Sequence, residues 1–276
     1  MGLASEERPL PLRRQTAVPG RIVCLTAEST EIVFRLGAGD RIVGVSGFAL
    51  FPSEARRKPR VGGYTGIRAE RVLALRPDLV LAYSDLQADV THDLIRAGAT
   101  VLHLNQRSVA QILDAILLIG RLIGEPEAAE RLCLQMAAEL EDRPTGIRRP
   151  RVYFEEWDQP LICGIGWVSD LIEAAGGTDI FRERAESSRA EERRVNPTEV
   201  VERDPEIVFA SWCGKRVSAE RIRSRPGWDQ ITGIQENRVV EIRAPHILQP
   251  GPSILHGFRQ MRETIRAYRE TTISRV

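Results

Sequence analysis

The chain has 276 residues, of which 42% are hydrophobic, and this length favours two domains or lobes over a single one. Its 39 Lys and Arg residues nearly balance its 38 Asp and Glu residues, so the net charge is +1. Such a balance gives no reason to expect binding to nucleic acid or to an anionic membrane surface. No apolar run approaches the roughly 20 residues that a membrane span requires.

The N-terminus and the cysteines bear on the cellular compartment. Residues 1–20 are rich in Pro and Arg and contain no apolar run of signal-peptide length, so we expect a disordered leader there. The four cysteines are scattered and form no CxxC pair, which is typical of reduced thiols. As the chain stands, these features predict a cytoplasmic protein. If an export signal has been removed, the same sequence fits a periplasmic one.

A first lobe is predicted over residues 21–124, where short apolar strands alternate with helices. Strands are expected at 21–25, 41–45, 79–82 and 100–104. Helices are expected at 27–36, 68–75, 89–97 and 109–123. This alternation is typical of a parallel sheet whose strands are joined by crossover helices.

One helix comes next with no strand after it for some distance, so we interpret residues 125–145 as a linking helix. Its apolar residues recur every four positions and would form a buried stripe, made of Ala128, Leu132, Met136 and Leu140. Pro144 and Gly146 end it. A second α/β series then fills residues 146–276. Its strands are expected at 152–155, 207–211 and 239–242, and its helices at 168–175, 197–203, 219–223 and 253–268.

The two series contain an internal sequence repeat. Residues 70–82 and 199–210 each hold a helix that ends near a proline, Pro77 or Pro205, ahead of an acidic residue and an apolar strand. The proline cannot continue a helix and leads the chain into an extended segment. This repeat is either a common helix-to-strand junction or evidence of two similar lobes. On the second interpretation the fold class is α/β, with two Rossmann-like lobes joined by a single long helix.

Five segments, by their order and spacing, resemble the class III periplasmic binding proteins with a helical backbone. That family comprises cobalamin-, haem- and iron–siderophore-binding components of ABC importers. The segments are residues 21–31, 36–46, 61–64, 70–82 and 170–177. The chain is also similar to a subgroup of cobalamin-binding proteins without a signal peptide, which carries Glu-Glu-Trp-Asp and Trp-Cys-Gly-Lys segments.

The resemblance implies a small-molecule ligand, such as cobalamin or another metal chelate, held between two lobes that move little on binding. It implies that the protein is no enzyme, has no catalytic or metal-ligating residue and no cofactor of its own, and has an ABC permease as partner. A monomer is expected.

The resemblance also concerns docking to the permease, for which the family uses one surface glutamate in each lobe. Glu70 stands seven residues before Pro77, as in the family. In the second lobe that offset from Pro205 falls on Thr198, and Glu199 comes one residue late. One residue is about 100° of helix rotation, so we expect that Glu199 does not mirror Glu70.

The ligand site should lie beyond the carboxyl ends of the strands, where α/β folds bind their ligands. In the first lobe Glu28 follows the first strand at the start of a helix. The amides there could hold an anion, or Thr26 could simply cap the helix. Tyr64, and Tyr83 with Asp85, follow later strands. The resemblance implies aromatic platforms at the two tyrosines.

The second lobe begins with an acidic segment, Glu155–Asp158, that leaves a strand. In extended backbone Glu155 and Trp157 face one way and Glu156 and Asp158 the other. One pair could therefore face the cleft, and a solvated acidic loop is the alternative.

Two further segments of the second lobe follow strands. Trp212, Cys213 and Lys215 come directly after the strand at 207–211. His246 follows the last strand, where the family brings a final polar contact to its ligand.

Two functions remain open on these residues. The first is a binding protein for a corrinoid or related chelate, held between Tyr64, Tyr83, Trp157 and Trp212. The second is an intracellular metal-handling protein or enzyme that uses Cys213, Lys215, His246 and the segment Glu155–Asp158. The sequence contains no HExxH, GxxxxGK[ST] or GxSxG motif, so we favour the first.

Overall fold

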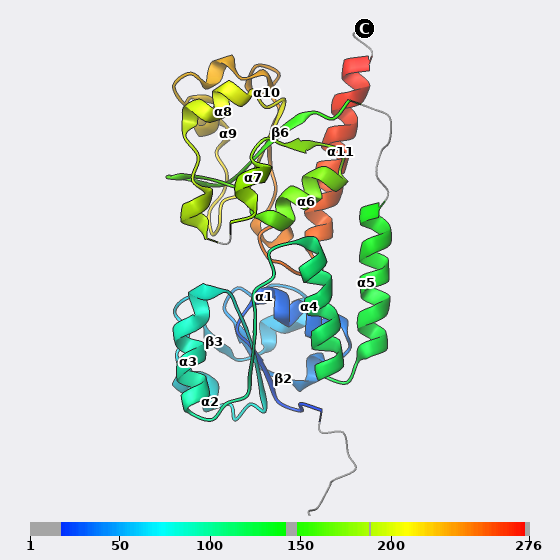
Figure 1. Ribbon diagram of the computed structural model, residues 1–276. Coiled ribbons are helices and arrows are strands. Elements are labelled where there is room, and N and C mark those ends of the chain that lie inside the picture. The colour runs from blue at the N-terminus through cyan, green and yellow to red at the C-terminus, as the bar shows by residue number, and fades with distance from the viewer. Residues whose placement is uncertain (1–17, 142–147, 188, 274–276) are drawn as a thin grey trace, which may run out of the picture.

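The computed structural model describes residues 18–141, 148–187 and 189–273. It contains two lobes, each with its own sheet, and helix α5 (Pro126–Glu141) runs along one side from the first lobe toward the second (Figure 1). Most of the predicted leader, the boundary at residue 145 and the helix-ending Pro144 and Gly146 lie outside the described residues. Among the described residues no helix is both long and apolar enough to span a bilayer.

The first lobe has a five-stranded parallel sheet in the order β3-β2-β1-β4-β5. The strands are β1 (Ile22–Cys24), β2 (Ile42–Ser46), β3 (Arg60–Gly62), β4 (Leu79–Tyr83) and β5 (Val101–Leu104). The helices are α1 (Ala27–Arg35), α2 (Ala69–Leu73), α3 (Ala88–Arg96) and α4 (Val109–Leu122). All the elements expected in this lobe are present. The short strand β3 was not expected.

The second lobe has its sheet in the order β10-β9-β6-β7, and β8 also pairs with β6. The strands are β6 (Arg151–Asp158), β7 (Leu161–Cys163), β8 (Thr178–Asp179), β9 (Ile207–Ala210) and β10 (Val239–Glu241). The helices are α6 (Gly166–Ala174), α7 (Arg182–Ala185), α8 (Pro197–Arg203), α9 (Ala219–Arg223), α10 (Thr232–Gln235) and α11 (Ile254–Ile273). Strand β7 is antiparallel to β6, so this lobe departs from a purely parallel arrangement.

The proline junctions are equivalent in the two lobes. The residue before each proline has left-handed backbone, with φ of 47° at Arg76 and 42° at Asp204. In both lobes a strand begins two residues after the proline, β4 after Pro77 and β9 after Pro205. The internal sequence repeat therefore corresponds to a repeated structural unit.

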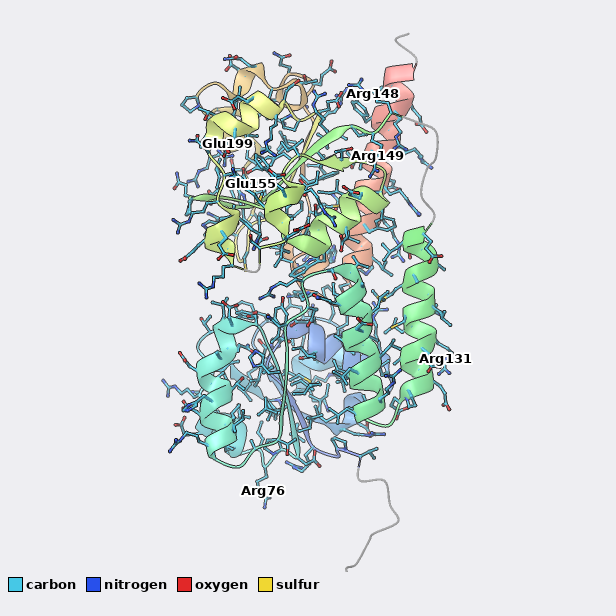
Figure 2. The ribbon with its side chains drawn as sticks, in the orientation of Figure 1. Arg76, Arg131, Arg148, Arg149, Glu155 and Glu199 are labelled. Carbon is cyan, nitrogen blue, oxygen red and sulfur yellow. The ribbon has the colours of Figure 1, made fainter. Side chains whose placement is uncertain are left out.

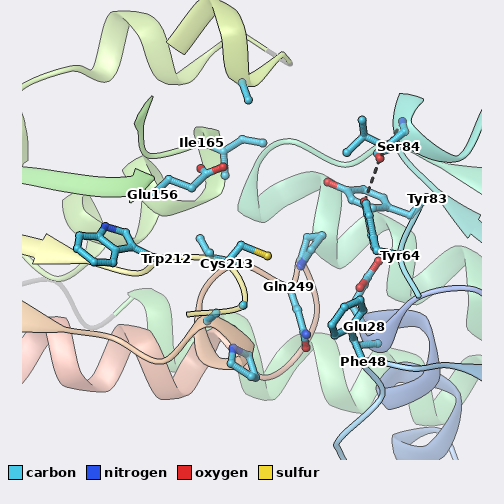
Figure 3. Close-up of a pocket in the computed structure, with 18 of the residues that line it drawn as sticks. Glu28, Phe48, Tyr64, Tyr83, Ser84, Glu156, Ile165, Trp212, Cys213 and Gln249 are labelled. Carbon is cyan, nitrogen blue, oxygen red and sulfur yellow. Dashed lines mark hydrogen bonds between the residues drawn. The ribbon is translucent and has the colours of Figure 1, made fainter. Parts of the chain in front are cut away.

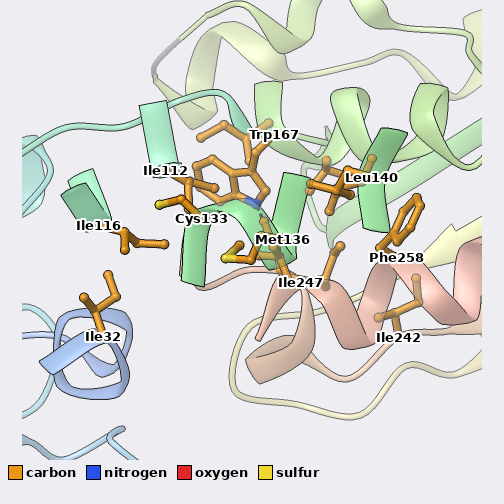
Figure 4. Close-up of a cluster of buried hydrophobic side chains, with 14 of the residues drawn as sticks. Ile32, Ile112, Ile116, Cys133, Met136, Leu140, Trp167, Ile242, Ile247 and Phe258 are labelled. Atoms are coloured by element: carbon orange, nitrogen blue, oxygen red, sulfur yellow. Dashed lines mark hydrogen bonds between the residues drawn. The ribbon is translucent and has the colours of Figure 1, made fainter. Parts of the chain in front are cut away.

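One apolar core continues from lobe to lobe behind the cleft. It runs from Ile32 on α1 through Ile116 on α4 and Met136 on α5 to Trp167 on α6 and Phe258 on α11 (Figure 4). Moving the lobes apart would expose this surface at a cost of about 25 cal/mol per Å². The shared core thus holds the relative position of the two lobes.

Helix α5 buries the second half of the predicted stripe, Met136 and Leu140, but not the first half. Its buried residues are Ala129, Cys133, Met136 and Leu140. Ala128 and Leu132 are only partly buried at the edge of the core. The prediction assumed a strict four-residue spacing, whereas a helix of 3.6 residues per turn alternates steps of three and four.

Candidate ligand-binding site

A cleft of about 1550 Å³ lies between the two lobes (Figure 3). It opens at the carboxyl ends of the strands in both sheets, where parallel α/β sheets place their ligands. Its volume exceeds the roughly 300–1,000 Å³ of ordinary small-molecule sites. Five aromatic side chains line it, namely Phe48, Tyr64, Tyr83, Trp167 and Trp212.

The wall from the first lobe holds three predicted site residues together. Tyr64, Tyr83 and Asp85 all line the cleft. Arg107 Nη1 donates to the Tyr83 hydroxyl at 2.5 Å, and Arg107 Nη2 lies 3.5 Å from Asp85 Oδ1. The Tyr64 hydroxyl is 3.0 Å from Ser84 Oγ, and either group can donate. Burial raises the pKa of both tyrosines, so they meet a ligand as neutral phenols.

Glu28, also predicted, lies at the base of this wall, in the first turn of α1. Its side chain is almost fully buried, with the residue 4% exposed. Burial is the main reason that the pKa of Glu28 rises to about 7, and the nearby charge of Glu31 adds to the rise. A hydrogen bond from Thr26 opposes it. Thr26 does cap α1, as its side chain accepts from the Ser29 amide.

The acidic segment of the second lobe does not keep the alternation that the sequence predicted. The pairing of β6 with β7 shifts register between Glu155 and Trp157, as an irregular extra residue in a strand does. Glu156 lines the cleft, but Asp158, which a regular alternation would place on the same side, is buried and absent from the cleft wall. Glu156 accepts two hydrogen bonds from the buried guanidinium of Arg193, at 2.6 and 3.0 Å.

The predicted ligand contact of Glu155 is wrong. Its side chain is fully buried within the second lobe, where Figure 2 labels it. Arg225 donates to it at 2.5 and 2.9 Å, and Trp212 Nε1 donates at 3.0 Å. Burial raises the pKa of Glu155, while these donors favour its ionised form. Glu155 therefore holds Trp212, which does line the cleft as predicted.

The predicted ligand contact of Trp157 is also wrong, because Trp157 supports a neighbouring side chain instead. It is absent from the cleft wall, and the Lys215 Nζ lies 4.1 Å from its ring centroid. Lys215 Nζ is also 4.9 Å from the Trp212 ring and donates to Asp158 Oδ1 at 2.5 Å. The two indoles and Asp158 thus fix the ammonium of Lys215 on the cleft wall.

His246 points away from the cleft, contrary to prediction. Its ring packs against Phe51 and His256, with centroids 6.0 and 5.0 Å away. The neighbouring Pro245 and Gln249 line the cleft in its place. The backbone turns at residues 244–246, and sequence position alone could not show which side chain the turn directs inward.

Cys213 lines the cleft and is exposed, but its surroundings do not activate the thiol. Burial and the charge of Glu156 raise its pKa, which disfavours the nucleophilic thiolate. Lys215 is paired with Asp158, and His246 lies elsewhere. Within the ranges that the structure describes, no cluster of His, Cys, Asp and Glu suited to a metal ion occurs. Of the residues in the enzyme or metal-handling hypothesis, Cys213 and Lys215 therefore share the cleft wall, while His246 and Glu155 lie away from it.

Sequence reasoning missed the arginines of the site. Arg107 follows β5 and Arg193 lies near the end of the 3₁₀ turn at residues 190–193. The strand-end rule could have identified Arg107. Arg193 offered no such signal, because its guanidinium reaches the cleft from a loop. Three more arginines line the cleft without an ion pair among the described residues: Arg189, Arg216 and Arg243.

The two predicted docking glutamates differ as expected. Glu70 is exposed in the first turn of α2, shortly after Gly66 of the cleft wall. Glu199, labelled in Figure 2, completes a capping box with Asn196 at the start of α8 and pairs with Arg184 at 2.5 Å. Its carboxylate is thus engaged within the lobe.

Comparison with known proteins agrees with this architecture. The model of the family described as Periplasmic binding protein matches residues 22–245. The chain belongs to this family. It is therefore a ligand-binding protein of two α/β lobes, the function and fold expected from the sequence.

Among named relatives, an uncharacterized ABC transporter substrate-binding lipoprotein, YvrC, of Bacillus subtilis is 26% identical over 90% of this chain and 80% of its own length. A vitamin B12-binding protein of Vibrio campbellii is 25% identical over 91% of this chain and 90% of its own. The periplasmic heme-binding protein RhuT of Roseiflexus sp. RS-1 superposes with a TM-score of 0.74 at 23% identity, covering 89% of this chain and 97% of that one.

Proposed function

We propose that this protein captures a large metal chelate of the corrinoid or haem type between its lobes and presents it, unaltered, to an ABC permease. The observation that carries the proposal is the cleft of about 1550 Å³, walled by five aromatic side chains from both lobes. Phe48, which is 54% exposed, and the partly buried Tyr64 offer aromatic faces to a flat macrocycle. Tyr83, Trp167 and Trp212 are only 3–6% exposed and form the backing of the wall. The vitamin B12-binding relative and the heme-binding neighbour are named for such ligands.

The charges of the cleft fit the side arms of such a chelate. Arg189, Arg216 and Arg243 line it and form no ion pair within the described part of the chain. Guanidinium groups suit carboxylate and phosphate partners. A ligand with acidic or amide arms around an apolar centre matches this wall.

The same geometry supports binding without chemical conversion. The thiol of Cys213 is not activated, and the amine of Lys215 is held by Asp158. For location, the lipoprotein relative and the periplasmic neighbour favour a site of action outside the cytoplasm, in place of the cytoplasmic one expected from the sequence. Fractionation of the native host, with the protein detected by antibody, tests that placement.

Calorimetric titration with cyanocobalamin, haemin and a ferric siderophore tests the ligand class. We expect one of them to bind in a 1:1 ratio. Phe48 is 54% exposed on the cleft wall, so Phe48→Ala should weaken binding by about 1–2 kcal/mol without loss of stability. Leu134→Ala, which removes a side chain 70% exposed on α5, is the control and should change neither. Absence of binding by all three, together with a ligand-free native mass spectrum from the host, would refute the proposal.

A further inference from the structure

Glu28 is the one predicted carboxyl that is both buried and directed into the cleft. It lines the cleft wall while only 4% exposed, and in Figure 3 it lies beside Tyr64. Its Oε1 atom is buried and has no hydrogen-bond partner among the described residues. A buried polar atom without a partner is costly, so this atom is placed for a group that comes from the ligand.

Glu28 has no cation to balance a negative charge. Within the described chain no Arg or Lys forms an ion pair with it, and the charged group that acts on it is the carboxylate of Glu31. Glu31 itself is bound, by Arg35 at 2.9 Å and by the amide of Ser253 at 3.2 Å. Glu28 therefore has no cationic partner of its own among the described residues.

The groups that face Glu28 from β1 and from the two tyrosine segments are neutral, and Arg107, a cation of the same wall, donates to the Tyr83 hydroxyl at 2.5 Å. Cys24 on β1 has a thiol pKa raised to about 12 by burial. Burial, with a contribution from the nearby Glu28, raises the pKa of two phenols, those of Tyr64, before α2, and Tyr83, at the end of β4. Both phenols therefore stay protonated. Gly251, from the segment before α11, presses on Glu28 so closely that a Cβ there would lie 2.8 Å from the Glu28 Cβ. A ligand that covers this wall removes the remaining water and favours the uncharged carboxyl further.

We propose that Glu28 meets the ligand as a neutral carboxyl that donates a hydrogen bond to a carbonyl or carboxylate arm, so that the ligand binds together with a proton. The inference rests on the proposed function and specifies its chemistry at one atom. It makes Glu28 a specificity-determining residue that selects ligands with an acceptor at this point.

The direction of the pH dependence follows from proton linkage. In the free protein the pKa of Glu28 is about 7, so above that pH the carboxyl must take up a proton before it can donate. Affinity should fall up to about tenfold for each pH unit above 7. At pH 8, titrations in buffers of different ionisation enthalpy should show uptake of nearly one proton per ligand.

Two variants separate this proposal from a general effect of pH. Glu28→Gln keeps a donor at the same place and should bind cyanocobalamin or haemin with an affinity that no longer falls above pH 7. Glu31→Gln removes the neighbouring negative charge. The affinity of this variant should still fall with rising pH, but the fall should begin at lower pH. Thermal unfolding of each variant establishes that it is folded.

The outcomes are distinct for the function and for the inference. If a probe binds with no proton uptake, with proton release, or with the same pH dependence in Glu28→Gln, the inference is overturned. If neither probe binds, the proposed function fails for them. Carbon-13 NMR of the glutamate carboxyls, with Glu28→Gln to assign the signal, then tests the premise: a titration near pH 7 supports a carboxyl that can donate to some other ligand, and one near pH 4.5 overturns the inference.

Discussion

Asp78 and Glu206 accept equivalent backbone hydrogen bonds in the two lobes. Asp78 Oδ1 accepts a hydrogen bond from the Arg21 amide, just before β1, and Glu206 Oε2 accepts one from the Arg151 amide, at the start of β6; both bonds are 2.9 Å long. Each acidic residue follows the proline of its lobe. The paired strands match too, since Ile22 lies opposite Leu79 in one sheet and Val152 opposite Ile207 in the other. The repeated unit therefore extends to individual hydrogen bonds.

The two carboxylates should nevertheless differ in their effect on stability. Glu206 is buried and also binds Arg148 at 2.5 Å and the Tyr268 hydroxyl at 2.6 Å, whereas Asp78 is exposed. We expect Glu206→Ala to lower the free energy of unfolding by about 3 kcal/mol, since three hydrogen-bond donors, among them the buried Tyr268 hydroxyl, lose their acceptor. Asp78→Ala should cost about 1 kcal/mol. Urea unfolding of both variants gives the comparison, and equal losses would contradict it.

The buried pair of Glu155 and Arg225 leads to a second prediction. Arg225→Met removes both guanidinium donors from the buried Glu155 carboxylate and leaves the Trp212 indole N–H at 3.0 Å, which should cost about 3–5 kcal/mol. Glu155→Gln combined with Arg225→Met should recover part of that loss. Burial already raises the pKa of Glu155 in the parent, and loss of the Arg225 guanidinium raises it further, so the folded variant holds this proton to higher pH than the parent does. Its stability should fall as pH rises from about 4.5, as unfolding at several pH values can measure.

The positions of the strands and helices could be predicted because they depend on local pattern. Apolar runs such as Ile22–Cys24 and the proline junctions carry their signal in consecutive residues. Strand β7 and the irregularity in β6 depend on how two segments pair, and neither segment shows this alone. The helix α5 stripe is a different case, because its residues follow the 3.6-residue period of a helix, which the sequence alone carries.

The site was predictable wherever the strand-end rule applied to the backbone. Tyr64, Tyr83 and Cys213 reach the cleft because their loops do. The prediction failed where the direction of a side chain depended on distant partners. Glu155 is drawn inward by Arg225, which is 70 positions away in sequence, and His246 packs on Phe51 of the other lobe.

A third prediction concerns Asp158, which anchors Lys215. Burial opposes its charge, but hydrogen bonding and attraction from Lys215, with help from Arg221 at 3.0 Å, keep the pKa of Asp158 below its usual value. Stability from this group is present above its unfolded pKa and is lost as pH falls through the lower folded pKa. Asp158→Asn should therefore be less stable than the parent at pH 7, by about 1.5–3 kcal/mol. The difference should shrink below about pH 4, and a constant difference down to pH 2 would argue against the pairing.

The last prediction separates docking from folding at Glu70 and Glu199. Glu70 is exposed, at the second position of α2, so Glu70→Ala should change the free energy of unfolding by less than about 0.5 kcal/mol. Glu199 occupies the third position of α8, where it binds the Asn196 amide at 2.9 Å and the Arg184 guanidinium. Glu199→Ala should therefore cost about 0.5–2 kcal/mol.

For docking to the permease the larger effect should come from Glu70→Ala, the reverse of the order expected for stability. Since the Glu199 carboxylate is engaged within its lobe, Glu70→Ala should weaken capture of the native permease in detergent or nanodiscs more than Glu199→Ala does. Glu70→Gln, which keeps the shape and removes the charge, should weaken capture as Glu70→Ala does if arginines of the permease are the partners. Exposed Glu54→Gln, on the segment before β3, serves as the control for a general loss of negative charge. Equal weakening by Glu70→Ala and Glu199→Ala, after correction for stability, would show that both lobes dock through glutamates despite the difference in helix position.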